Sequence, residues 1–321
     1  MPDLPVLLQI GSFTTRMADQ LAPRFEILSL FEAPDRAALL AARGADVVAI
    51  CTDGHWGIPD DVFEACPKLQ VAASYGVGYD GIDVERALSR GILVSHTPDV
   101  LNDEVAATAL MLWFAVARRL VLQDAWARSG TWERRGNAPL TQTVVRRQVG
   151  VLGFGRIGQT IARLAEAHGA TVHYHARSRR DAPQIFHPNP VALAHAVDVL
   201  IVITPGGSET RHLVNRPVLD ALGPEGILIN VARGSVVDED ALVSALVDGR
   251  LGGAGLDVFA DEPTIPEAIK SLENVVLTPH IGSATYETRA AMGDLVCDNL
   301  IKWLQDGTLK TPVPECAALL A

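Results

Sequence analysis

The chain has 321 residues, of which 48% are hydrophobic and 20% are charged, and its formal net charge is −11. A chain of this length exceeds the size at which one hydrophobic core usually stops growing, so we expect two domains. The acidic balance argues against nonspecific binding to nucleic acid or to an anionic membrane surface, and it implies that individual arginines must capture any anionic substrate.

Short apolar runs alternate with helical patterns through the first hundred residues. Such alternation is typical of a parallel sheet whose strands are joined by right-handed crossovers, so we expect a doubly wound α/β domain. Strands are expected at Val6–Ile10, Phe25–Leu30, Val47–Ile50, Val71–Ser74 and Ile92–Ser95. The helices between them are expected at Pro34–Arg43, Pro59–Ala65 and Val84–Arg90.

A long helix is predicted next, over Asn102–Leu122. Its apolar run, Ala106 to Ala117, is too short to span a bilayer, and the apolar stretch near the N-terminus has the length of a strand and lacks a basic flank. The segment Arg128–Arg147 reads as a long irregular loop, for which dimer contact or active-site closure are the natural roles. We therefore expect a soluble chain without membrane contact.

The four cysteines Cys51, Cys66, Cys297 and Cys316 lie far apart and form no CxxC pair or metal-ligand spacing. They are interpreted as reduced thiols, as expected in the cytoplasm.

A second alternating series begins at Gln148 and predicts a second parallel sheet. Its helices include Ile157–His168 and Glu239–Asp248, and a last helix covers Ala284–Asp306. Its strands are expected at Val149–Gly153, Thr171–His175, Val199–Ile203, Ile227–Asn230, Gly253–Asp257 and Val275–Leu277.

The glycine motif Gly153-Phe154-Gly155-Arg156-Ile157-Gly158 lies between an apolar strand and a helix, which is the context that a dinucleotide-binding fingerprint requires. Gly153 permits the tight turn, Gly155 lets a pyrophosphate approach the backbone, and Gly158 lets the helix pack close to the strand. The phosphates would then lie at the positive end of the helix. The plainer interpretation is a glycine-rich turn without a ligand.

The end of the next strand distinguishes between two cofactors. NAD enzymes carry an acidic residue here, whereas this strand ends His175-Ala176-Arg177-Ser178-Arg179-Arg180, with no carboxylate before Asp181. Arg177, Ser178 and Arg180 are suited to a 2′-phosphate, which favours NADP(H) over NAD(H). The alternative is a solvated basic loop. His173 and His175 have strand spacing, but no third ligand lies nearby, so no metal site is predicted.

Three polar residues follow consecutive strands of the second series. Arg233, Glu262 and His280 each come after a strand, and ligands of open α/β sheets bind at the carboxyl ends of strands. Each alone reads as a surface charge or a structural residue. Together, behind the glycine motif, they predict a catalytic set beside the nicotinamide.

The sequence at this point resembles the D-isomer-specific 2-hydroxyacid dehydrogenase family, and within it the glyoxylate/hydroxypyruvate reductases. The resemblance covers nearly the whole chain. It is carried by Ser74-Tyr75-Gly76-Val77-Gly78-Tyr79-Asp80, Asn102-Asp103-Glu104-Val105-Ala106, the glycine motif, Val231-Ala232-Arg233-Gly234, the segment with Asp257 and Glu262, and Thr278-Pro279-His280.

The resemblance implies a role for each member of the catalytic set. His280 would protonate the carbonyl oxygen, and Glu262 would orient its ring and favour the protonated form. Arg233 would hold the substrate carboxylate and keto oxygen. The backbone N–H groups of Val77 and Gly78 would also bind the carboxylate.

Asp257 would bind the nicotinamide amide. The predicted cofactor site comprises Gly153, Gly155, Arg156, Ile157, Gly158, Arg177, Ser178, Arg180, Thr204, Val231, Asp257, His280 and Gly282.

The implied architecture is two doubly wound parallel-sheet domains with a cleft between them. Residues 1–99 plus 287–321 would form a flavodoxin-like substrate domain, and residues 100–286 a Rossmann cofactor domain. The resemblance also implies a homodimer, with Asn102–Leu122 and the following loop in the interface. Trp126 and Trp132 would either anchor this interface, line the active site of the neighbouring subunit, or make only ordinary packing contacts.

Three functions remain open at this level. Glyoxylate and hydroxypyruvate are the leading substrates. Trp56 and Tyr75 leave room for a larger side chain, as in a NAD-dependent dehydrogenase of the D-lactate or phenylpyruvate type. The same fold also serves co-repressors that sense nicotinamide cofactors, but the acidic surface and the intact catalytic set argue against that role.

Overall fold

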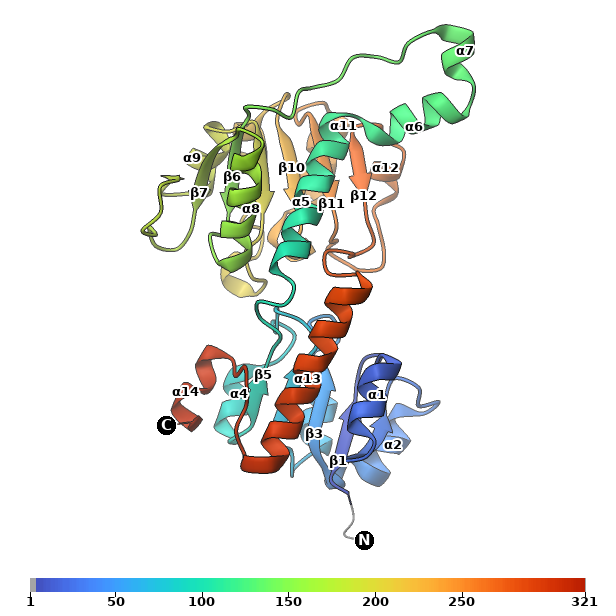
Figure 1. Ribbon diagram of the computed structural model, residues 1–321, viewed down its shortest axis with the longest axis vertical. Helices are drawn as coiled ribbons and strands as arrows, with labels where there is room; N and C mark the ends of the chain where they lie inside the picture. Colours follow the sequence, from blue (N-terminus) through green and yellow to red (C-terminus); the bar gives the residue numbers. More distant parts are fainter. Residues whose placement is uncertain (1–3, 321) are drawn as a thin grey trace. The chain divides into compact units, whose positions relative to one another are not determined.

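The computed structural model describes residues 4–320, which divide into two compact units (Figure 1). Unit 1 comprises the described residues up to Leu101 and those from Thr285 onward, and unit 2 comprises Asn102–Ala284. Each unit contains one parallel sheet with its own hydrophobic core. The predicted fold class is therefore confirmed.

Unit 1 has a five-stranded sheet in the order β2-β1-β3-β4-β5, with every pair parallel. This order is doubly wound and reverses direction between β1 and β3. The strands are β1 Val6–Gln9, β2 Glu26–Ser29, β3 Val47–Thr52, β4 Val71–Ser74 and β5 Leu93–Ser95, all at the predicted places. The helices are α1 Thr15–Leu21, α2 Arg36–Arg43, α3 Asp60–Ala65, α4 Val84–Ser89, α13 Tyr286–Asp306 and α14 Ala317–Leu320.

Unit 2 has a seven-stranded sheet in the order β12-β11-β10-β9-β6-β7-β8. The strands are β6 Gln148–Leu152, β7 Thr171–His175, β8 Ile185–Phe186, β9 Val199–Val202, β10 Ile227–Asn230, β11 Gly253–Leu256 and β12 Val275–Leu277. The helices are α5 Asn102–Ala117, α6 Leu120–Arg128, α7 Thr131–Arg135, α8 Arg156–Ala167, α9 Pro190–His195, α10 Arg216–Leu222, α11 Glu239–Val247 and α12 Glu267–Lys270.

The strand order of unit 2 also explains which helices share a face of the sheet. The chain passes from β6 to its neighbour β7 and then back across β6 to β9. Right-handed crossovers in opposite directions place α8 and α9 on opposite faces. α5 packs beside α8 (Figure 1), while α9, α10 and α11 contact one another in sequence.

The central strands of unit 2 are covered on both sides, and their sequences are correspondingly apolar. β9 and β10 are buried at every residue. Buried parallel strands read as continuous apolar runs because helices cover both faces. Asn230 is the polar exception, at the carboxyl end of β10, and it is 1% exposed.

The predicted C-terminal end of the helix Asn102–Leu122 is wrong. α5 stops at Ala117, Arg119 adopts a left-handed conformation with φ 45°, and α6 starts at Leu120 at an angle of 60° to α5. The break falls where the buried apolar run meets the pair Arg118-Arg119, whose exposed side chains do not extend the packing of α5. The segment predicted as an irregular loop contains α7.

Within residues 4–320 no single helix has the length and apolar character needed to cross a membrane. The bent pair of α5 and α6 satisfies both criteria together. Most residues of α5, however, are buried within unit 2, where α5 packs on α8 and on strands β10, β11 and β12.

Candidate active site

The glycine motif forms the turn between β6 and α8. Gly153 has φ 103°, and a Cβ there would lie 2.7 Å from the carbonyl oxygen of Ile203. A Cβ at Gly158 would overlap the carbonyl oxygen of Gly153, so α8 packs against this turn more closely than a side chain would allow. A Cβ at Gly155 would meet nothing within 4 Å. Two glycines thus permit close packing, and the third faces open space.

This turn fits the phosphates of a dinucleotide. α8 begins at Arg156, and its N-cap residue Gly155 provides no side-chain cap, so the positive end of the helix is suited to a phosphate. Thr204 follows β9, the neighbour of β6, and its buried hydroxyl has no hydrogen-bond partner in the described structure. Burying a hydroxyl without a hydrogen-bond partner costs free energy, and a bound ligand can supply the missing partner.

The basic turn after β7 is tied to the glycine motif through Tyr174. The ring of Tyr174 stacks on Phe154 with centroids 4.1 Å apart, and its hydroxyl binds both the N–H and the carbonyl of Arg180. The Arg177 side chain is 91% exposed, and its guanidinium lies 3.6 Å from the Glu209 carboxylate. Positive charge is therefore held beside the glycine turn, partly balanced by one acid.

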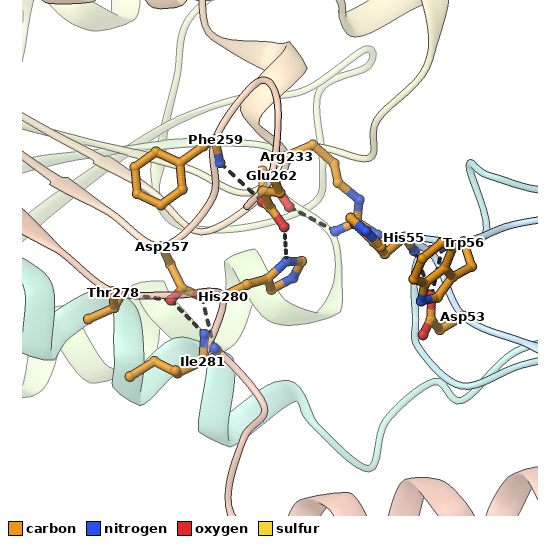
Figure 2. A network of polar contacts seen from close by, with 12 residues as sticks. Asp53, His55, Trp56, Arg233, Asp257, Phe259, Glu262, Thr278, His280 and Ile281 are labelled. Atoms are coloured by element: carbon orange, nitrogen blue, oxygen red, sulfur yellow. Dashed lines mark hydrogen bonds and ion pairs between the residues drawn. The ribbon is translucent and has the colours of Figure 1, made fainter. Parts of the chain in front are cut away.

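The predicted catalytic residues come from three adjacent strands of unit 2. Arg233, Glu262 and His280 follow β10, β11 and β12, which lie side by side at one end of the sheet. His280 Nδ1 lies 2.8 Å from Glu262 Oε2 (Figure 2), and Glu262 Oε1 accepts a hydrogen bond from the N–H of Phe259. The His280 side chain is 44% exposed and that of Glu262 is 19% exposed. The Glu262 carboxylate thus holds one ring nitrogen of His280, while solvent or a ligand can still reach the His280 ring.

Asp257 anchors the loop that carries His280 (Figure 2). Its carboxylate is 1% exposed and accepts bonds from the Thr278 hydroxyl at 2.6 Å and from the N–H groups of Ile281 at 2.7 Å and Gly282 at 2.8 Å. His280 is held with φ 53°, a conformation that persists only where its surroundings enforce it. The contact between Asp257 and the nicotinamide stays a prediction, whereas the three hydrogen bonds show that the Asp257 carboxylate holds this loop.

Arg233 is placed by residues to which the sequence interpretation gave no role. Asn230 binds both the Arg233 carbonyl and the N–H of Ala232, which fixes the turn after β10. A Cβ at Gly234 would overlap the backbone of Phe259, so this turn lies directly on the loop that ends at Glu262. The sequence signal for this role was an asparagine, Asn230, at the end of an otherwise apolar strand.

The remaining predicted residues lie at the carboxyl ends of strands in their own units. Ile157 is the second residue of α8, Val231 follows β10 and is 7% exposed, and Ser178 is exposed in the basic turn. Val77 and Gly78 follow β4 in unit 1. Their N–H groups donate to no acceptor in residues 4–320.

The histidines of β7 form a hydrogen-bonded cluster. His173 lies 2.9 Å from both His187 and Gln148, and His175 lies 2.8 Å from the His187 carbonyl. In the described part of the chain, no three acidic, histidine or cysteine side chains group in a way that could hold a metal ion.

All four cysteines are buried free thiols. Burial raises the pKa of Cys66 to about 11 and that of Cys297 to about 12, so neither resembles a reactive thiolate.

Comparison with known proteins agrees with this site. Residues 110–282 match the family described as D-isomer specific 2-hydroxyacid dehydrogenase, NAD binding domain. The chain is 42% identical to hydroxyphenylpyruvate reductase of Plectranthus scutellarioides over 308 residues, 96% of this chain and 98% of that one. It is 41% identical to a glyoxylate/hydroxypyruvate reductase of Arabidopsis thaliana, with the same coverage. Among solved structures, the NADPH-dependent glyoxylate/hydroxypyruvate reductase of Sinorhizobium meliloti in complex with NADP and malonate superimposes with a TM-score of 0.92, at 48% identity and 97% coverage of each chain.

Proposed function

Because this chain belongs to the D-isomer specific 2-hydroxyacid dehydrogenase family, we propose that it reduces glyoxylate and hydroxypyruvate to the corresponding 2-hydroxy acids with NADPH. The observation that carries this proposal is the 2.8 Å contact between His280 and Glu262 at the same sheet edge as the glycine turn. We assign the cofactor to unit 2 and the substrate carboxylate turn to unit 1.

The glycine turn would hold the phosphates of NADPH and Asp257 its nicotinamide, and the bound cofactor would supply a hydride for the carbonyl carbon. His280 holds a proton at Nε2, the ring nitrogen that does not face Glu262, and donates it to the carbonyl oxygen. Glu262 keeps Nδ1 protonated and the ring oriented, since a carboxylate only accepts. Arg233 binds the substrate carboxylate and polarises the keto oxygen through its planar set of donors.

The preference for NADPH rests on the turn after β7. Arg177, Ser178 and Arg180 are exposed there, and Arg180 is fixed through Tyr174 beside the glycine turn. Two guanidinium groups and a hydroxyl are suited to a 2′-phosphate. The relative of known structure that is named NADPH-dependent supports this assignment.

Aromatic 2-keto acids are the second candidate class. Phe31 and Trp56, which follow β2 and β3 in unit 1, pack edge to face with centroids 6.4 Å apart, yet they are 51% and 43% exposed. An exposed aromatic pair at the carboxyl end of a sheet offers a surface for an aromatic side chain. The relative named for hydroxyphenylpyruvate supports this reading.

We also propose a homodimer whose interface includes α6, α7 and the segment that follows them. Five large apolar side chains are exposed there: Leu120, Val121, Trp132, Leu140 and Val145. Exposed apolar residues gathered on one segment are typical of an interface. Sedimentation equilibrium should give twice the mass of 34.3 kDa, and Leu140→Arg with Val121→Arg should give the monomer mass. A wild-type monomer would refute this assembly.

A cytoplasmic location is supported by the four free thiols, which suit a reducing compartment. Cell fractionation with an antibody to the chain tests it, and recovery in an oxidising compartment would contradict it.

Initial rates test the reaction itself. Glyoxylate, hydroxypyruvate and phenylpyruvate are each offered with NADPH and with NADH, to the wild type and to His280→Gln. We expect turnover with NADPH and a loss of at least about a hundredfold in kcat for His280→Gln, because the proton donor is removed. His168→Gln is the matched control, since His168 lies at the far end of α8 against Phe114. Near-normal rates in His280→Gln would refute the mechanism.

A further inference from the structure

In the turn after β4, the backbone carbonyls and the backbone N–H groups differ in their hydrogen bonding. Its carbonyls at Gly76, Val77, Gly78 and Tyr79 all accept hydrogen bonds from the protein. The N–H groups of Gly76, Val77 and Gly78 donate to no acceptor in the described residues 4–320. Every carbonyl is therefore held while successive N–H groups are left for an anion, as the proposed substrate carboxylate site requires.

Peptide geometry connects the two sets of groups. In a trans peptide, the carbonyl of one residue and the N–H of the next lie in one plane and point in opposite directions. Whatever holds the Gly76 carbonyl therefore aims the N–H of Val77, and whatever holds the Val77 carbonyl aims the N–H of Gly78. These two N–H groups are the ones assigned to the substrate.

The two carbonyls are held in different ways. The Gly76 carbonyl accepts from the backbone N–H of Thr97 at 2.9 Å, a bond that no side-chain substitution removes directly. The Val77 carbonyl lies 2.9 Å from Nδ1 of His96. A carbonyl oxygen only accepts, so Nδ1 carries the proton. The direction of the Gly78 N–H thus depends on one side chain.

His96 is itself fixed from several sides. The residue is 9% exposed, and its ring packs edge to face on Tyr79 with centroids 5.2 Å apart. Its N–H donates to the carbonyl of Thr311, and its carbonyl accepts from the Thr311 hydroxyl at 2.6 Å. The ring therefore has little freedom to leave the Val77 carbonyl.

We propose that His96 is a positioning residue for substrate binding: its Nδ1–H holds the Val77 carbonyl and thereby aims the Gly78 N–H at the carboxylate of the 2-keto acid. This inference rests on the proposed function, because it assumes that the turn after β4 binds that carboxylate. His96 touches neither substrate nor cofactor in this scheme. It acts through the peptide plane between Val77 and Gly78.

The test compares three variants of the full-length enzyme with NADPH bound. His96→Leu removes the donor, His96→Asn keeps a short side chain with an amide donor, and Thr311→Val removes the hydroxyl that binds the His96 carbonyl without touching the Val77 carbonyl. The measurements are the KM for glyoxylate and for hydroxypyruvate, kcat, the inhibition constant of malonate, the NADPH dissociation constant and Tm.

We expect His96→Leu to raise both KM values and the malonate inhibition constant by about tenfold, which corresponds to about 1.4 kcal/mol. The factor should be equal for the two substrates, because their carboxylates are the same, and NADPH affinity should not change. His96→Asn should recover most of the loss. Thr311→Val should lower Tm but leave KM within about twofold, because the His96 N–H still donates to the Thr311 carbonyl and the His96 ring still packs on Tyr79.

The inference is wrong if His96→Leu leaves KM unchanged, if His96→Asn binds substrate no better than His96→Leu, or if Thr311→Val raises KM as much as His96→Leu. Failure of the proposed function gives a different result, since the wild type itself would then reduce neither substrate.

Discussion

Asp257→Asn should separate the anchoring of His280 from its chemistry. The Asp257 carboxylate accepts three hydrogen bonds, from the Thr278 hydroxyl and from the N–H groups of Ile281 and Gly282. Asparagine replaces one oxygen with an NH₂ group, so at least one of these buried donors would face another donor. An unsatisfied buried donor costs about 1–3 kcal/mol, and a hydrogen bond to a charged group contributes about 1.5–3 kcal/mol. We expect the free energy of unfolding to fall by about 3 kcal/mol.

The same change should reduce activity more than stability alone would. His280 keeps φ 53° only while its loop is held, and relaxation of the loop would lengthen the 2.8 Å contact between His280 and Glu262. A displacement of about 1 Å at a reacting group can cost about a hundredfold in rate. We therefore expect kcat/KM to fall by about that factor at temperatures where the variant remains folded.

Urea unfolding followed by tryptophan fluorescence and initial rates with NADPH measure the two effects. Asp261→Asn makes the same chemical change at an exposed position in the nearby loop and should alter neither quantity. Wild-type stability together with wild-type kcat/KM in Asp257→Asn would refute the anchoring role.

Three further changes test other parts of the structure. Gly158→Ala puts a methyl group onto the Gly153 carbonyl and should raise the NADPH dissociation constant at least about tenfold in a fluorescence titration, whereas an unchanged value would contradict the close packing. Glu209→Gln removes the carboxylate that lies 3.6 Å from the Arg177 guanidinium. Because that carboxylate would repel the 2′-phosphate through screened water, the KM for NADPH should fall about threefold. Equal changes in KM for NADPH and NADH would contradict an effect on the 2′-phosphate. Burial lowers the pKa of both His173 and His187, with a further lowering from a neighbouring histidine. The unfolded chain then binds protons more readily, so stability in urea should decrease as pH falls below about 6.5 and level off below the lowered values. His187→Gln should flatten this dependence, and an unchanged pH profile would contradict it.

Local patterns in the sequence predicted most of the secondary structure and the set of candidate residues. Buried parallel strands leave continuous apolar runs, and four predicted strands match the structure at both ends: Val71–Ser74, Thr171–His175, Ile227–Asn230 and Val275–Leu277. The two-residue strand β8 was not predicted, because it is too short to leave such a run. The glycine motif was equally clear, because a tight turn and close helix packing require glycine wherever they occur. The end of α5 was not predictable in this way, since Ala117 and Leu120 are both good helix formers and the break depends on what each packs against.

The sequence alone therefore determined the α/β fold, the positions of most strands along the chain and which residues could form a site. Only the tertiary structure decided how those residues are held. Asp257 reaches Thr278 across 21 residues, and His96 reaches Val77 across 19, because neighbouring parallel strands bring their carboxyl ends to one edge of a sheet. Such bonds leave no periodic trace in the sequence, since each depends on the register of two strands. The partner of His96 is moreover a backbone carbonyl, which any residue could supply.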